Sequence, residues 1–169
     1  YGKVLGGGMP IGVVAGAARF MDALDGGAWR YGDNSAPEVG VTFFAGTFVR
    51  HPMALAAARA VLTHLRESGP QLQQQLNARC QNLAAALQAE ADDLGVPLKV
   101  SQFSSWFHFQ WTADLPFSAL FYPAMRMRGI HVWEGRPCFI TTAHGDAELQ
   151  AITAAVRESL SELQKLGLL

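Results

Sequence analysis

Two stretches with apolar residues at helical spacing most constrain the fold of this chain. Over residues 71–94 the apolar side chains recur mainly at steps of three or four, and they are Leu72, Leu76, Cys80, Leu83, Leu87 and Leu94. A later stripe consists of Leu149, Ile152, Val156, Leu160 and Leu163. This spacing is typical of amphipathic helices that pack on a core. We therefore expect two long helices, the first ended by Gly95 and the second capped by Asp146.

Shorter elements are predicted between and before these helices. An alanine-rich helix over residues 53–68 has Leu55, Val61, Leu62 and Leu65 near one face, and Gly69 and Pro70 end it. The aromatic segment "LKVSQFSSWFHFQW" alternates in part, which predicts one or two strands. A helix over residues 116–128 should follow, and then two short strands at "GIHVW" and "PCFITTA".

The change of character near residue 96 predicts a domain boundary. The glycine-rich first part resembles the end of an α/β unit. We expect residues 1–96 to form the end of a large α/β domain with its connecting helices, and residues 97–169 to form a small α+β domain. A length of 169 residues suits either one ordinary domain or part of a larger protein.

Composition excludes several classes of partner. Half of the residues are hydrophobic, 16% are charged and the formal net charge is −1, so neither a nucleic-acid footprint nor a basic membrane patch is present. The apolar run over residues 4–18 is shorter than the roughly 20 residues of a membrane span. Cys80 and Cys138 form no C-x-x-C pair, which predicts reduced thiols and a cytoplasmic location. No signal peptide is apparent, and a start at Tyr1 suggests a chain cut from a longer one.

The opening segment "YGKVLGGGMPIG" places a single cation, Lys3, before a run of glycines. A phosphate-binding P-loop has its lysine after the glycines, and the G-x-G-x-x-G spacing is absent here. Two interpretations remain from these residues alone. The segment is either a structural turn with an incidental lysine, or a lysine that meets a flat ligand closely approached by the backbone.

Three motifs together resemble a known family. They are "YGKVLGGGMPIGVVAG", "FFAGTFVRHPMALAAA" and "VWEGRPCFITTAHGD". The first two are similar to motifs of the class III aminotransferases, fold type I enzymes that depend on pyridoxal 5′-phosphate (PLP), and especially to those like glutamate-1-semialdehyde aminomutase. The third resembles aminotransferase domains embedded in hybrid polyketide and nonribosomal peptide synthetases. The resemblance covers nearly all residues and corresponds to the carboxy-terminal portion of such an enzyme.

The resemblance implies that Lys3 is the catalytic residue and forms an imine with the PLP aldehyde. A primary amine can make that bond and, once released, can move protons between the substrate and the cofactor. A free lysine has a pKa of about 10.4, so the site has to favour the neutral amine. PLP itself supplies the electron sink.

Gly46 and Thr47 match the family position that binds the PLP phosphate of the neighbouring subunit, which implies a homodimer with shared active sites. A simple turn is the alternative interpretation of an isolated Gly-Thr pair. The family commonly has an asparagine before the proline, whereas this chain has Arg50 and His51 there.

Glu134 and Arg136 fall where the family places groups near the substrate entrance. Arg136 could bind a carboxylate of the amino donor through two hydrogen bonds, and a surface ion pair is the alternative. The histidines show no metal-binding spacing, so no metal is expected, and no G-x-S-x-G motif of a serine hydrolase is present.

The expected function is PLP-dependent transfer of an amino group from an amino acid donor to a carbonyl acceptor. The likeness to synthetase domains implies a β-ketoacyl thioester as acceptor, with an acyl carrier protein as partner. The alternatives are an aminomutase and a non-catalytic dimerisation or docking module of the same fold. In this family the other cofactor-binding residues precede the lysine, so residues 1–169 alone are expected to be inactive.

Overall fold

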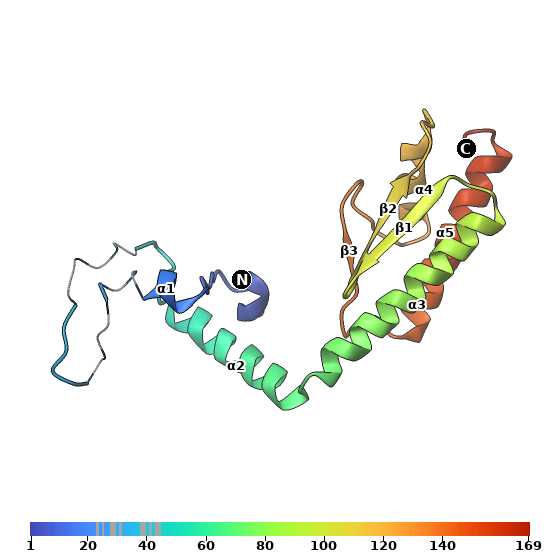
Figure 1. Ribbon diagram of the computed structural model, residues 1–169. Helices are drawn as coiled ribbons and strands as arrows, with labels where there is room; N and C mark the ends of the chain where they lie inside the picture. Colours follow the sequence, from blue (N-terminus) through green and yellow to red (C-terminus); the bar gives the residue numbers. More distant parts are fainter. Residues whose placement is uncertain are drawn as a thin grey trace. The chain divides into compact units, whose positions relative to one another are not determined.

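The computed structural model describes residues 1–22, 24, 26–27, 30, 32–37, 40, 42 and 45–169. The chain separates into two compact units, Tyr1–Gly69 and Pro70–Leu169 (Figure 1). The predicted boundary at residue 96 lies inside the second unit, and the assignment of residues 1–96 and 97–169 to two domains stays a prediction.

The second unit is built on two long helices and a small sheet. Helix α3 spans Gln71–Asp93 and helix α5 spans Asp146–Lys165. Strands β1 (Leu98–Phe103), β2 (Trp106–Trp111) and β3 (Cys138–Phe139) form an antiparallel sheet in the order β1-β2-β3. Helix α3 packs against β1 and β2, and α5 lies beside α3 (Figure 1). The two predicted helices and the aromatic strands are thus confirmed.

The apolar stripes of α3 and α5 form the core of this unit, as their spacing predicts. The buried members are Cys80, Leu83, Leu87, Val156, Leu160 and Leu163, while Leu76, Leu94, Leu149 and Ile152 pack partly buried around them. Strand β2 adds two buried phenylalanines to the same cluster. Burial of apolar surface at about 25 cal/mol per Å² is the main force that holds these elements together.

Phe121 lies at the centre of the aromatic part of the core. It opens helix α4 (Phe121–Met127), directly after a 3₁₀ turn, η2 (Ser118–Leu120). Its ring has no exposed surface and lies edge-on to Phe109 at 5.2 Å and to Trp111 at 5.9 Å between ring centroids. Edge-to-face packing of this kind adds stability beyond the area that it buries. The predicted helix over residues 116–128 therefore corresponds to η2 and α4.

Two local predictions are wrong, and a third is confirmed only in part. The segment "GIHVW" is not a strand, because its ends take part in turns: the Ile130 amide donates to the Met125 carbonyl and the Arg136 amide donates to the Trp133 carbonyl. The strand predicted at "PCFITTA" exists but is shorter, since only Cys138 and Phe139 pair with β2.

The second wrong prediction concerns the start of α5. Gly145 occupies the N-cap position, and its amide donates to the Glu148 carboxylate at 2.8 Å. Asp146 is instead the first helical residue. Its charge still lies at the end of the helix where carboxylates are favourable.

Arginine side chains connect the helices of the second unit. Arg128 donates to Glu162 at 2.7 Å and to Glu158 at 3.1 Å, which joins the end of α4 to α5. The hydrogen bond to Glu162 is the main cause that raises the pKa of Arg128 above its usual value. Arg157 of α5 pairs with Glu90 and with Asp93 of α3. In each pair at least one side chain is half exposed or more, so these ion pairs contribute little to stability.

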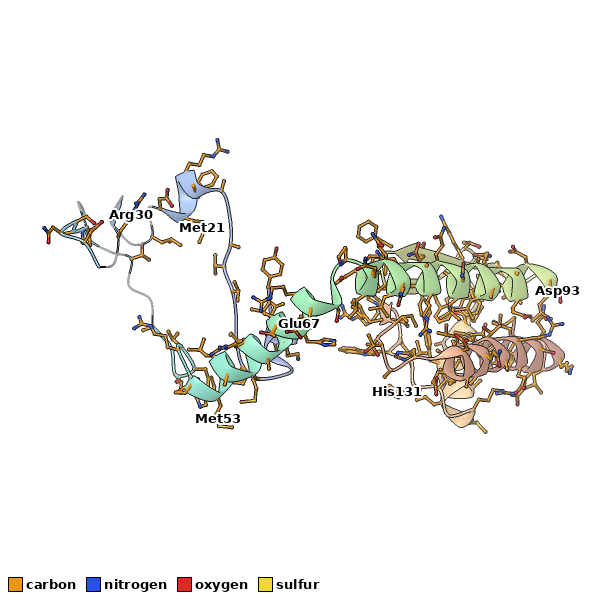
Figure 2. The ribbon with its side chains drawn as sticks, turned by 90° about the horizontal axis from the view of Figure 1, so that it is seen from below. Met21, Arg30, Met53, Glu67, Asp93 and His131 are labelled. Carbon is orange, nitrogen blue, oxygen red and sulfur yellow. The ribbon has the colours of Figure 1, made fainter. Side chains whose placement is uncertain are left out.

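The first unit contains η1 (Lys3–Gly6), α1 (Ala18–Met21) and α2 (Pro52–Ser68) among its described residues. Figure 2 shows α2 with Met53 in its first turn and Glu67 near its end. The predicted helix is confirmed, but its leucine face is not covered, since Leu55 is 50% and Leu62 is 49% exposed. Ala54 and Ala58 are its buried residues.

Within the described part of the chain, no helix is both long enough and apolar enough to pass through a membrane.

Both cysteines of the second unit are free thiols, Cys80 buried and Cys138 partly buried. Burial raises the pKa of Cys138 to about 11. Only the thiolate reacts with alkylating reagents, so we expect iodoacetamide to label Cys138 much more slowly at pH 8 in the folded chain than in denaturant. The rate should rise as the pH approaches 11. Mass spectrometry of the Cys138 peptide checks this, and equal labelling rates with and without denaturant at pH 8 would contradict it.

Candidate functional site

The glycines after Lys3 have a steric explanation. Gly6 is buried, and a Cβ atom there would lie 2.6 Å from Ile11 Cγ2. Gly7 has φ 59° and Gly8 has φ 91°, both in the left-handed region that favours glycine. The Gly8 amide donates to the Lys3 carbonyl at 3.0 Å. The glycines therefore close a tight turn directly behind Lys3.

A backbone pair fixes the two ends of this turn. The Val13 amide donates to the Tyr1 carbonyl at 2.9 Å, and the Tyr1 amino group donates to the Val13 carbonyl at 2.8 Å. Residues 1–13 thus form a closed loop with Lys3 near its start. The residues of the first unit leave the Lys3 side chain exposed.

Gly46 and Thr47 open a second turn, which leads into α2. The Val49 amide donates to the Gly46 carbonyl at 3.0 Å, and the His51 amide donates to the Phe48 carbonyl at 3.2 Å. A Cβ atom at Gly46 would come within 3.3 Å of Val49, tighter than ordinary contact. The turn thus prefers glycine at this position. Phe43 and Phe44, which begin the second motif, lie outside the described residues.

This turn lines a groove of about 870 Å³ on the first unit. Its lining includes Gly46, Thr47 and Arg50 of the turn and residues 10–14 of the Lys3 loop, and most of its lining side chains are apolar. Lys3 itself does not line the groove. The described residues therefore bring Gly46 and Thr47 together, but they do not bring Lys3 into the same pocket.

The few polar groups in and beside this mainly apolar groove suit an anion. Thr47 offers a hydroxyl, Arg50 offers a guanidinium, and the turn offers backbone amides. Next to the turn, Nδ1 of His51 is buried and has no hydrogen-bond partner among the residues that the structure describes. A phosphate oxygen is an acceptor that matches these donors. The donor set fits the phosphate of PLP.

Glu134 and Arg136 lie on an exposed turn of the second unit. Glu134 pairs with Arg126 of α4 at 3.5 Å, and the Arg136 guanidinium lies 5.3 Å from the centre of the Trp133 ring. Glu134 and Arg136 thus have different partners. The surface ion pair that was the alternative interpretation is formed by Glu134 with Arg126, and Arg136 takes no part in it.

The side chain of Tyr122 in α4 is hydrogen-bonded to this turn. The Gly135 amide donates to the Tyr122 hydroxyl at 3.4 Å, and burial raises the pKa of that hydroxyl. Trp133 and His131 also line an adjoining cavity of about 460 Å³ within the second unit. Sequence reasoning missed Arg126 and Trp133. The contact between Trp133 and Arg136 could have been expected from their spacing of three residues in the third motif.

No group of three or more metal-ligating side chains is found in the described ranges of the chain.

Known proteins resemble this chain over almost its whole length. No family model matches it. A glutamate-1-semialdehyde 2,1-aminomutase from Desulfosudis oleivorans is 31% identical over 96% of the chain. A solved structure of a transaminase with PLP bound covers 98% of the chain with a TM-score of 0.77 and 22% identity. An omega-transaminase from Sphaerobacter thermophilus covers 96% with a TM-score of 0.75 and 26% identity.

In each comparison the chain spans 38% of the length of the matched protein. The α/β fold class predicted from the sequence is confirmed, since helices and sheet follow those of PLP-dependent transaminases. The resemblance of the first two motifs to the class III aminotransferases is also confirmed, while the likeness of the third motif to synthetase domains stays a prediction. The chain is similar to a segment of PLP-dependent aminotransferases and of an aminomutase, and it has the fold of the corresponding segment of the transaminases.

Proposed function

We propose that the full-length protein is a PLP-dependent aminotransferase in which Lys3 is the catalytic residue. The observation that carries this proposal is the pair of turns: one sets a primary amine before three glycines, and the other presents Gly46 and Thr47 in a groove with anion-binding groups. The transaminase fold of the chain and the PLP bound to one related structure support it. Fold alone would not, because function depends on the site.

Each residue has a stated role in this proposal. Lys3 Nζ would hold the cofactor covalently and, once released, would accept the proton of the substrate α-carbon and pass it on. The amide of Gly46 and the hydroxyl of Thr47 hold the phosphate of the cofactor bound to the partner subunit. PLP supplies the electron sink when it is bound. This division of roles requires a homodimer.

We propose an amino acid as donor and a carrier-bound β-ketoacyl thioester as acceptor, with an acyl carrier protein as partner and a cytoplasmic location. The third motif supports this choice of acceptor, because it is similar to the motif of aminotransferase domains in polyketide and nonribosomal peptide synthetases. Residues 1–169 alone should neither bind PLP tightly nor turn over substrate. Turnover by that isolated segment would contradict the need for further cofactor-binding residues.

Borohydride trapping tests the proposal directly. The full-length protein is incubated with PLP, reduced, digested and analysed by mass spectrometry. The expected result is one labelled peptide, modified at Lys3, and no label at this position in Lys3→Ala. Label scattered over surface lysines, or no label, would sink the proposal and favour a non-catalytic dimerisation or docking module.

An aminomutase is the second candidate, and the name of the relative from Desulfosudis oleivorans favours it. In an aminomutase one substrate is both donor and acceptor. The two candidates differ when separate donors such as glutamate or glutamine are supplied, since only a transaminase accumulates the keto acid of the donor. Absence of that keto acid, with Lys3 labelled, would select the aminomutase.

We expect Arg136→Ala to raise the KM for the amino acid donor by about tenfold to a hundredfold, because a charge-assisted contact to the donor carboxylate is lost. Steady-state kinetics with varied donor measures this. The matched control is Arg126→Ala, which removes a charge from the same surface but pairs with Glu134 instead. Equal effects of both variants would show that Arg136 acts only through the general charge of this surface.

A further inference from the structure

Arg50 stands out in the groove because its backbone is strained. Its φ of 59° lies in the left-handed region, where a non-glycine residue is uncommon. Only one other described non-glycine residue has a positive φ, Ser104 in the hairpin between β1 and β2. Such a cost is retained when the side chain or the turn is needed. The side chain of Arg50 therefore needs an explanation.

The surroundings of Arg50 point to an anion. It lines the groove together with Gly46 and Thr47, on the same turn. No carboxylate in the described part of the chain lies within salt-bridge distance of its guanidinium. The groove is otherwise lined mainly by apolar side chains, so the Thr47 hydroxyl and the Arg50 guanidinium, which has no carboxylate partner among the described residues, are the groups in it that favour an anion.

We propose that Arg50 is a positioning residue that binds the phosphate monoester of PLP beside Gly46 and Thr47. This inference rests on the proposed function and assigns a charged contact to the phosphate site. A guanidinium can donate two hydrogen bonds to phosphate oxygens, which fixes the orientation of the group as well as its charge.

The test compares cofactors with and without the phosphate. In the full-length protein, Arg50→Gly should raise the Kd for PLP by about tenfold to a hundredfold. The Kd for pyridoxal, which lacks the phosphate, should change by less than about twofold. Absorbance titration measures both constants. The melting temperature of the apoprotein should stay the same or rise, because glycine adopts this backbone without strain.

Ser104→Gly is the matched control, since it relieves the same kind of backbone strain in the other unit. It should leave both constants unchanged. If Arg50→Gly fails to fold, Arg50→Asn replaces it, because asparagine tolerates the left-handed region. The expected loss of PLP affinity is the same for both variants.

Three outcomes would overturn the inference. They are an unchanged Kd for PLP, an equal loss for PLP and pyridoxal, and a loss of PLP affinity in Ser104→Gly. Failure of the proposed function can be told apart from failure of this inference, because in the former case the wild-type protein would show no PLP label on Lys3.

Discussion

Replacement of Lys3 by alanine is expected to lower the transamination rate of the full-length protein by about a thousandfold or more. The variant loses both the covalent attachment of the cofactor and the group that moves the proton, and each contributes strongly to such reactions. Stopped-flow or coupled assays of keto acid formation measure the loss. The fold should be unaffected, because the Lys3 side chain is exposed in the first unit.

Two further variants separate the chemistry from the charge. Lys3→Arg keeps a cation, but a guanidinium stays protonated at all working pH values, so this variant should be as inactive as Lys3→Ala. Small primary amines added to Lys3→Ala should restore part of the rate, because they supply the missing proton carrier. Substantial activity in Lys3→Arg would show that the role of this residue is electrostatic.

The largest effect on stability is expected for Phe121→Ala, which should lower the free energy of unfolding by about 3–5 kcal/mol. The ring is fully buried and packs edge-on against Phe109 and Trp111, so its removal leaves a cavity between a strand and a helix. Denaturant unfolding followed by tryptophan fluorescence checks this value. Trp111 should report directly on the loosened contact.

Phe117→Ala is the matched control for this variant. Phe117 lies four residues earlier in the same segment and is 52% exposed, so its removal should change stability by no more than about 0.5 kcal/mol. Similar losses from both variants would mean that the segment contributes through its local backbone structure. The aromatic cluster would then not be the centre of the core.

The long helices could be predicted because their apolar residues keep one period. The stripe of α5 reappears in the structure as a row of buried side chains that faces the core. The sequence wrongly predicts a strand at residues 129–133, because Val132 is an apolar, β-branched residue of the kind that strands bury. Val132 is indeed buried, but the backbone on either side forms turns through the amides of Ile130 and Arg136. Apolar content indicates burial, but backbone pairing depends on a partner strand that local sequence does not identify.

The leucine face of α2 also shows how far residue spacing can predict packing. Its leucines have helical spacing, yet Leu55 and Leu62 remain half exposed in the unit that contains them. Periodicity predicts which side of a helix is apolar, and it does not say what covers that side.

For the candidate site, motif spacing identified Lys3, Gly46 and Thr47, and the structure adds what spacing cannot show. The steric need for Gly6 comes from Ile11, which approaches from across the turn. The partner of Glu134 is Arg126, on a different element. Arg50 was visible as a departure from the family motif, but its place in the groove depends on backbone angles that no single residue type dictates.

The pairing of α3 with α5 has a consequence for synthesis on the ribosome. Arg157 reaches back to Glu90, and Gln164 donates to the Leu94 carbonyl at 2.7 Å, so the contacts that complete the core join residues about 70 positions apart. The apolar stripe of α3 leaves the ribosome first, and the part of it that α5 covers stays exposed until α5 has been translated, an interval on the order of seconds. Throughout that interval the nascent chain presents a leucine-rich surface to chaperones and to neighbouring chains.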